Sequence, residues 1–309
     1  MTPQELKNSI LQLAIAGKLV GQRAEEGTAE ELFAQIQAEK QRLVAEGKLK
    51  KQKPLPEITE EENPFDIPES WKWVRLGEVC LLNSKNDIDD DTEVSFIPMA
   101  CVSDGFNNKH TYEIRKWKEI KKSFNHFANG DIGVAKITPC FQNRKSVIFK
   151  DMKNGYGATP SRTNSEYYGG KIPWLKTGDL NDGYITDVPE FITELALEKT
   201  SVRLNPIGSV LIAMYGATIG KLGILKEPMT TNQACCACIP FNGIYNVYLF
   251  YFLMAYRMRF IKMGEGGAQP NISREKIINS ICPLPPLAEQ KRIVARLEEL
   301  LPLCDRLKK

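Results

Sequence analysis

Four short polar segments, and a fifth analogous to them, hold side chains that can hydrogen-bond to base edges and phosphates. They span residues 159–162, 176–177, 215–221 and 269–274, with the fifth at 142–145. The candidate residues are Thr159, Ser161, Arg162, Lys176, Thr177, Tyr215, Thr218, Lys221, Gln269, Asn271, Ser273, Arg274, Gln142, Arg144 and Lys145. Arginine and lysine can donate to guanine, amides can pair with adenine, and hydroxyls can bind phosphate. The combination is typical of a surface that contacts DNA.

A simpler interpretation applies to each segment, because turns are polar in most proteins and a basic loop is often only solvated. Residues 215–221 are not a nucleotide-binding P-loop, since Leu222 follows Lys221 where that motif needs serine or threonine. The most basic stretch, residues 109–122, fits phosphate contact and a solvated helix face equally well.

Motifs for catalysis are weak in this sequence. Asn63-Pro64-Phe65 matches the Asn/Asp-Pro-Pro-Tyr/Phe signature of DNA methyltransferases only in part, because the second proline is missing. Asp131 with Asp151-Met152-Lys153 gives a nuclease-like match that is common by chance. The two histidines form no legible hydrolase triad. We therefore expect a non-catalytic protein that holds no cofactor or metal of its own.

Composition indicates a folded protein, with 42% hydrophobic and 26% charged residues and a net charge of only +3. The sequence has no basic tail that would by itself indicate nucleic-acid binding. The eight cysteines form no C-x-x-C pairs, so we expect them to be small core residues in a reducing compartment. We find no signal peptide and no apolar run long enough to span a membrane, and we expect a cytoplasmic protein.

Two capping boxes, Thr2-Pro-Gln-Glu5 and Thr28-Ala-Glu-Glu31, predict two helices near the amino terminus, joined as a hairpin. The last helix is predicted to follow Pro286 and to be kinked by Pro302. Apolar residues at heptad spacing on the first and last helices need a partner, in the same chain or in another copy. The predicted interface residues are Leu6, Ile10, Leu13, Ile293, Leu297, Leu300 and Leu307.

Between these helices the pattern changes to short strands. We expect strands at residues 74–82, 94–102, 132–137, 146–149, 210–215, 223–225 and 234–240. An amphipathic helix at 245–263 should pack on them, with Arg257, Arg259 and Lys262 on its wetter side.

A weak internal repeat joins two parts of this region. Asp104-Gly105 recurs as Asp182-Gly183, 78 residues later, and the segment 130–136 recurs at 208–214 in the same frame. The alternative is that the second match is only a turn that enters a strand.

Several segments, taken in order, resemble the specificity (S) subunit of type I restriction-modification systems. The strongest are residues 6–20, Ile67-Pro-Glu-Ser-Trp-Lys-Trp-Val-Arg-Leu-Gly-Glu-Val79, Thr159-Pro-Ser-Arg162, residues 168–179, Gln269-Pro-Asn-Ile-Ser-Arg-Glu-Lys276 and Pro285-Pro-Leu-Ala-Glu-Gln-Lys-Arg-Ile-Val294. The resemblance implies an α/β target-recognition domain with a mixed, curved sheet and small helices. It also implies long antiparallel spacer helices from both chain ends.

The same resemblance implies the partners. These are double-stranded DNA, methyltransferase (M) subunits, a restriction (R) subunit, and a second copy of the chain or another S fragment. No membrane is expected among the partners. S-adenosylmethionine, Mg and ATP would be bound by the partner subunits. The implied function is sequence-specific DNA recognition that directs those subunits to a target site.

The chain departs from the family pattern, because about eighty residues separate the Trp-Val-x-Leu-Gly opening from Thr159-Pro-Ser-Arg162. The insert resembles the front of another recognition domain, so the chain is either a recombinant or a two-lobed reader. As a recombinant it could act only as a helical interaction scaffold. We expect spacer helices at 1–50, a linker at 51–68, a first lobe at 69–158, a second lobe at 159–285 and a spacer helix at 286–309.

Overall fold

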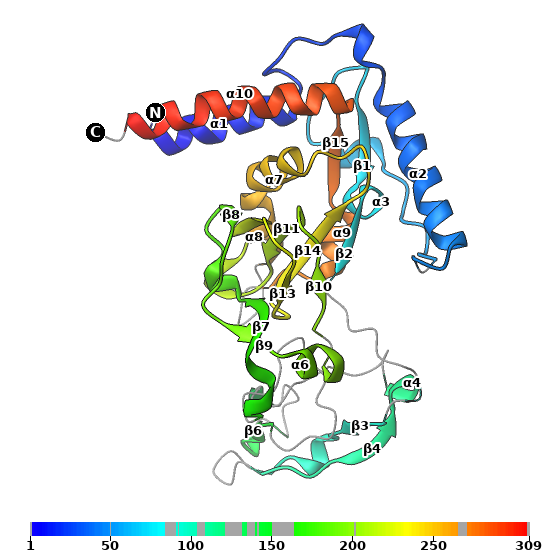
Figure 1. The fold of residues 1–309 in the computed structure, drawn as a ribbon, viewed down its shortest axis with the longest axis vertical. Coiled ribbons are helices and arrows are strands. Elements are labelled where there is room, and N and C mark those ends of the chain that lie inside the picture. Colours follow the sequence, from blue (N-terminus) through cyan, green and yellow to red (C-terminus); the bar gives the residue numbers. More distant parts are fainter. Residues whose placement is uncertain are drawn as a thin grey trace.

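The computed structural model describes residues 2–49, 51–83, 91, 93–103, 109–120, 132–134, 140, 142–149, 164–200, 202–264 and 271–307. Figure 1 shows a helical layer above a body of stacked sheets, with the strands of residues 93–148 at the opposite end. This mixed α/β architecture confirms the expected fold class.

A five-stranded mixed sheet forms the centre of the body, with strand order β2-β14-β11-β12-β8. Its strands are β2 (Cys80–Asn83), β8 (Gly183–Ile185), β11 (Val210–Ala213), β12 (Leu222–Leu225) and β14 (Cys235–Pro240). Only the β12–β8 pair is parallel. Val210 and Ile212 face the helices, whereas Leu211 and Ala213 face a second sheet. The sheet is therefore buried on both faces, as the continuous apolar run of β11 requires.

A four-stranded sheet, ordered β10-β13-β7-β9, covers the second face. Its strands are β7 (Tyr168–Leu175), β9 (Phe191–Ile192), β10 (Leu204–Asn205) and β13 (Met229–Thr231), and α6 (Glu194–Lys199) follows β9. Leu175 and Met229 from this sheet pack against Leu211 of β11. Of these strands, the sequence indicated only the Ile172-Pro173-Trp174 part of β7.

The predicted strand at 74–82 is two strands, β1 (Lys72–Arg75) and β2, separated by the short helix α3 (Leu76–Val79). β1 pairs with β15 (Ile281–Leu284) and β2 pairs with β14, both antiparallel. Residues 72–83 therefore complete the body that resumes at 164. These two strands fall inside the expected first lobe at 69–158 but pair with strands of the expected second lobe, and the strands from β3 onward form a smaller lobe.

That smaller lobe contains two antiparallel pairs. β3 (Glu93–Phe96) pairs with β4 (Glu113–Lys116), and β5 (Ile132–Val134) pairs with β6 (Ser146–Ile148). The short helix α4 (Trp117–Ile120) follows β4. Val102, Val147 and Phe149 form its small core.

The helical layer covers the first face of the central sheet. The predicted helix at 245–263 is divided at Tyr256 into α7 (Asn246–Ala255) and α8 (Arg257–Gly264), and α9 (Arg274–Asn279) precedes β15. α7 is apolar on all sides because it packs between the sheet and the terminal helices. Tyr248 donates to the Pro283 carbonyl at 2.8 Å, which satisfies a buried hydroxyl.

The first helix, α1 (Pro3–Ile15), and the last, α10 (Leu287–Arg306), lie side by side and antiparallel (Figure 1). Lys7 pairs with Asp305 at 2.6 Å, and Arg292 donates to the Gly21 carbonyl at 3.0 Å. The helix continues through Pro302 to Arg306. The expected antiparallel helices from both chain ends are confirmed.

Polar contacts fix the start of α10. Trp71 donates its indole hydrogen to Glu289 at 2.9 Å, and burial raises the pKa of that carboxyl. Glu26 accepts from Arg292 at 2.6 and 2.7 Å, and this bond holds the pKa of Glu26 below its usual value. The amino-terminal region is thereby tied to the carboxy-terminal helix.

Both capping boxes are present, with each threonine and each glutamate making the expected bond to backbone. The expected hairpin of the first two helices is wrong. α2 (Ala29–Ala45) extends away from α1 (Figure 1) and packs near α3, where Lys40 donates to the carbonyls of Gly77 and Glu78 at 3.3 Å. α1 packs on α10 and α7 instead.

The expected linker at 51–68 is anchored to the body by one buried arginine. Arg75 is 5% exposed. It donates to the Pro56 carbonyl at 2.7 Å, the Glu57 carbonyl at 3.0 Å and the Asn279 carbonyl at 2.8 Å. It also donates three hydrogen bonds to the Glu62 carboxylate, and these bonds hold the pKa of that carboxyl below its usual value. Such fork geometry is specific to arginine.

All eight cysteines are free thiols, and six of them are buried, as expected for core residues. Within the described ranges, no group of three or more His, Cys, Asp or Glu side chains is placed to hold a metal ion. No helix among those residues has the length and apolar character needed to cross a membrane.

Replacing Arg75 with methionine should cost about 2–3 kcal/mol of unfolding free energy, since three part-buried backbone carbonyls and the Glu62 carboxylate lose their donor. Urea unfolding and proteolysis of residues 51–62 measure the effect. Lys72→Met, which removes an exposed ion pair to Glu30, is the control and should cost under about 0.5 kcal/mol. Equal costs for the two variants would contradict the anchoring role.

Candidate nucleic-acid interface

The turn 215–221 leaves the central sheet after β11 and returns as β12. Thr218 donates its hydroxyl to the Tyr215 carbonyl at 3.0 Å, and Lys221 N donates to the Thr218 carbonyl at 2.9 Å. Gly220 has a φ of 78°, which favours glycine. Lys221 is exposed, so its ammonium is available to a ligand.

The segment at 271–274 lies against this turn. Asn271 forms an antiparallel bridge with Tyr215, and Ile272 N donates to the Met214 carbonyl at 2.9 Å. Ser273 caps α9 by accepting from Lys276 N at 3.2 Å. The structure therefore brings together two predicted segments that lie more than fifty residues apart in the sequence.

Arg274 has a structural task in this arrangement. Its Nε and Nη2 atoms donate to the Leu82 carbonyl at 3.1 and 2.8 Å, which fixes the end of β2. Burial lowers the pKa of this guanidinium. Two of its five donor hydrogens are thus used within the body, and a bidentate contact to a base would compete with them.

Arg257 organises the turn, and the sequence did not single it out for this. Its Nε donates to the Gly220 carbonyl at 2.9 Å, and its Nη2 pairs with Asp182. Asp182 has a φ of 60° and also accepts from Leu222 N at 3.0 Å. A Cβ on Gly220 would lie 2.8 Å from the Arg257 side chain, so a larger residue does not fit. In the sequence, the Asp182-Gly183 pair of the internal repeat was the signal that pointed to this turn.

Positive charge surrounds these two segments. α8 contains three basic residues and no acidic one. As predicted, Arg259 and Lys262 are exposed, whereas Arg257 is half-buried because of its bonds. Arg259 stacks over the Tyr256 ring at 4.7 Å. Lys276 of α9 donates to the Met263 carbonyl at 2.5 Å, which places it beside the end of α8.

The other predicted segments lie elsewhere or outside the described residues. Lys176 and Thr177 follow β7, where the Lys176 ammonium pairs with Glu190 and its backbone N–H donates to Asp179 at 2.7 Å. In the small lobe, Gln142 and Arg144 are exposed, and Lys145 donates to the Met99 carbonyl at 2.7 Å. Outside the described residues lie Thr159, Ser161, Arg162 and Gln269.

The predicted interface residues on α1 and α10 differ in burial. Ile293 and Leu297 are fully buried within this chain, so they pack against its own helices rather than presenting a surface to another subunit. Leu6, Ile10 and Leu300 are half-buried. Leu13 is 43% exposed and Leu307 is 62% exposed, and Leu303 of α10 is a further exposed leucine.

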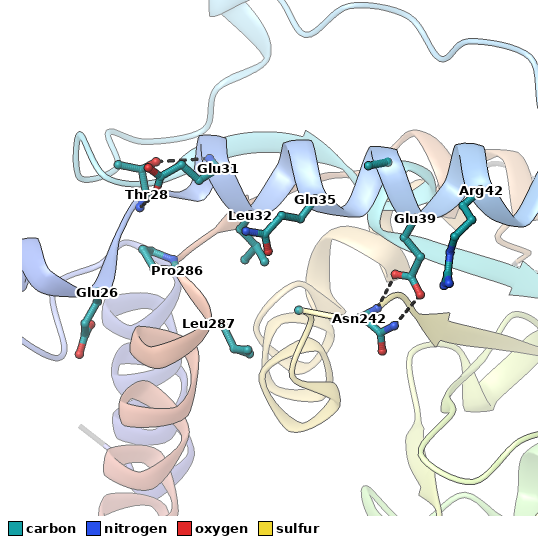
Figure 2. A pocket seen from close by; sticks show the side chains of 12 residues that line it. Glu26, Thr28, Glu31, Leu32, Gln35, Glu39, Arg42, Asn242, Pro286 and Leu287 are labelled. Atoms are coloured by element: carbon teal, nitrogen blue, oxygen red, sulfur yellow. Dashed lines mark hydrogen bonds between the residues drawn. The ribbon is translucent and has the colours of Figure 1, made fainter.

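A groove of about 580 Å³ lies between α2, the start of α10 and the 242–243 turn (Figure 2). Glu26, Glu31 and Glu39 line it with a single arginine, Arg42. Glu39 accepts from Asn242 at 3.0 and 2.6 Å. Carboxylates repel phosphate, so this groove does not fit DNA, and the basic turns are the better candidate.

Comparison with known proteins identifies the family. A family model described as "Type I restriction modification DNA specificity domain" matches residues 150–309, which is more than half of the chain. The chain belongs to this family.

Two relatives are similar over long stretches. The Escherichia coli "Type I restriction enzyme EcoAI specificity subunit" is 36% identical over 311 residues, covering 98% of this chain and 40% of the relative. The Escherichia coli "Type I restriction enzyme EcoEI specificity subunit" is 52% identical over 155 residues, covering 50% of this chain and 26% of the relative. The chain thus spans less than half the length of either relative.

Among solved structures, the HsdS subunit from Thermoanaerobacter tengcongensis matches 80% of this chain and 93% of its own. The TM-score is 0.39 at 15% identity, a likeness too weak to support an argument about this fold. The matched family range contains both segments of the basic site, since β11, β12 and α9 lie within it.

Replacing Arg257 with methionine should loosen the turn of this specificity-family domain. We expect amide hydrogen exchange at Gly220 and Lys221 to become about tenfold faster, because the bond that ties the turn to α8 and the neighbouring pair with Asp182 are both lost. Arg259→Met, which removes the contacts of an exposed arginine with the Tyr256 ring and hydroxyl and none with the turn, is the control. Unchanged exchange in the Arg257 variant would show that Arg257 does not position the turn.

Proposed function

We propose that the chain is a non-catalytic DNA-specificity subunit, or half of one, of a type I restriction-modification complex. Double-stranded DNA is its ligand. The observation that carries the proposal is the junction of the 215–221 turn with the 271–274 segment beside the basic helix α8. The family match and the relatives' names support it.

The residues would divide by chemistry. Exposed cations, Lys221, Arg259 and Lys262, suit phosphates, which position a protein without selecting sequence. Thr218, Asn271 and Ser273 can hydrogen-bond to base edges or to the sugar-phosphate backbone. For the other candidate residues, DNA contact stays a prediction. These residues are Thr159, Ser161, Arg162, Lys176, Thr177, Tyr215, Gln269, Arg274, Gln142, Arg144 and Lys145.

The helix pair α1–α10 would serve the protein partners. Its exposed leucines, Leu13, Leu303 and Leu307, form an apolar face suited to a methyltransferase (M) subunit, a second copy of the chain or another S fragment. A restriction (R) subunit would join such a complex. S-adenosylmethionine, Mg and ATP would be bound by those subunits, which act in the cytoplasm.

A second candidate function is a recombined S fragment that acts only as a helical scaffold. The observation favouring it is that the family model begins at residue 150, whereas β1 and β2, which complete the body's sheets, come from residues 72–83. The small lobe is inserted between these two parts. Mixing the purified chain with the methyltransferase and a random DNA library separates the candidates. Methylation enriched at one motif supports the first, and co-elution without a motif supports the second.

Replacing Lys221 with glutamine should weaken duplex binding about three- to tenfold near 0.15 M salt. It should also lower the slope of log K against log[salt] by about 1, because one phosphate contact is lost. Fluorescence anisotropy at several salt concentrations measures both. Lys48→Gln, an exposed lysine paired with Glu46 beyond α2, is the control. If the variant keeps the salt slope of the unchanged protein, Lys221 does not contact a phosphate.

A further inference from the structure

A buried carboxyl group at the start of α10 has only half of its hydrogen-bonding capacity filled. Glu289 is 1% exposed, and its Oε2 atom accepts the indole hydrogen of Trp71 at 2.9 Å. Its Oε1 atom is also buried and accepts no hydrogen bond from the described residues. An ionised carboxylate can only accept, and buried polar atoms are almost always hydrogen-bonded. The negative form of Glu289 therefore fits this place poorly.

The next residue shows that this turn of the helix can satisfy a buried polar side chain in full. Gln290 is 0% exposed. It accepts from the Tyr245 N–H at 2.8 Å, and it donates to the carbonyls of Gly243 and Pro285 at 3.1 and 3.0 Å. The unfilled acceptor is thus a property of the Glu289 carboxyl and not of a loosely packed helix end.

The cation that acts on Glu289 is already paired with another acid. Arg292, about one turn further along α10, donates through Nε and Nη2 to Glu26 at 2.7 and 2.6 Å. Its Nη1 atom donates to the Gly21 carbonyl at 3.0 Å. Because Arg292 and Glu26 neutralise each other, an ionised Glu289 leaves excess negative charge in this corner, whereas a protonated Glu289 leaves it neutral.

The surroundings favour the neutral form of this carboxyl. Burial is the largest influence on the pKa of Glu289 and raises it, and the charge of Glu26 raises it further. Hydrogen bonds from Trp71 and Gln22, and the charge of Arg292, lower the pKa by less. The other charged side chains on residues 17–26, on residues 68–71 and on the first turn of α10 are exposed, and they are Lys18, Arg23, Glu25, Glu69 and Lys291. Water screens these exposed charges, so the carboxyl responds mainly to its burial.

The Trp71 indole that reaches this carboxyl lies where two separate stretches of the chain meet α10. Ser70, beside Trp71, donates to the Gln22 side chain at 3.2 Å, and the Ser70 carbonyl accepts from Ala29 N at 2.8 Å. A Cβ on Gly17 would lie 3.3 Å from the Trp71 ring, so the backbone at that glycine also packs on the indole. Through Trp71, the ionisation state of the carboxyl therefore acts on the whole amino-terminal stretch that follows α1.

We propose that Glu289 is a proton-controlled switch, whose neutral form holds residues 17–29 and 68–71 firmly on α10 and whose ionised form loosens them. On ionisation the carboxyl O–H bond breaks and the proton passes to solvent water. In the neutral form Gln22, whose amide presents either an oxygen or an NH2 group, is the acceptor for the acid hydrogen. Since the folded chain binds this proton more tightly than the unfolded chain, the stabilisation is complete below the ordinary carboxyl pKa. It is lost as pH rises through the raised pKa.

The test follows the indole N–H signal of Trp71 by ¹H–¹⁵N NMR in the full chain, from about pH 4 to about pH 9, with Trp71→Phe to assign it. The signal should shift with one midpoint above the ordinary glutamate pKa of 4.5. Hydrogen exchange of residues 17–29, corrected for its intrinsic pH dependence, should become faster over the same pH range. The increase should be at most about tenfold for each pH unit by which the pKa is raised.

Two glutamine variants separate the switch from ordinary packing. Glu289→Gln keeps an acceptor for Trp71 but cannot ionise, so the titration should vanish and the exchange should lose its pH dependence. Glu26→Gln, the matched control, weakens the bonds of Arg292 and frees its charge to act on Glu289. In that variant the Trp71 titration should remain, with its midpoint moved to lower pH.

Four results would overturn the inference. They are a midpoint at or below the ordinary value, a Trp71 titration that persists in Glu289→Gln, exchange of residues 17–29 that does not follow the midpoint, and a midpoint that stays unmoved in Glu26→Gln. If Glu289→Gln does not fold, the titration of the parent protein and the shift in Glu26→Gln decide between the two results alone.

Discussion

Because α1 and α10 pack antiparallel against each other, two apolar faces nearly three hundred residues apart in the sequence are enclosed in one structure. Ile15 and Ile293 are both buried in the core cluster that also contains α7. The Trp71–Glu289 and Glu26–Arg292 contacts then fix where α10 begins. β15 leads directly into α10 and pairs with β1. The packing of α1 on α10 therefore also fixes the position of the β1–β15 strand pair.

The candidate DNA surface follows from that framework. Burial on both faces of the central sheet makes β11 and β12 rigid, so the turn between them can hold a left-handed residue. Arg257 ties that turn to α8, and Arg274 ties α9 to β2. These two arginines support the site from inside the body, while Lys221 and Lys262 remain outside. The acid-lined groove near α2 lies among different elements, so the two surfaces are suited to different ligands.

Local signals predicted local structure well. The capping boxes at Thr2 and Thr28 located both helix starts, and the apolar runs located β11 and β14. Partners distant in sequence were missed, since pairing such as β1 with β15 has no local pattern. The hairpin prediction for α1 and α2 failed for the same reason. At the site, residue type identified Lys221 and Asn271, but the roles of Arg257 and Arg274 depend on carbonyls that only the fold brings near.

The most direct test of the central claim is whether α1 and α10 close within one chain. Lys7 and Asp305 lie 2.6 Å apart, so a carbodiimide should join them. Mass spectrometry of a mixture of ¹⁴N- and ¹⁵N-labelled chains then identifies which chains are linked. The account predicts Lys7–Asp305 products with a single isotope label. Light–heavy products in the proportion expected for random pairing of the two kinds of chain would contradict it.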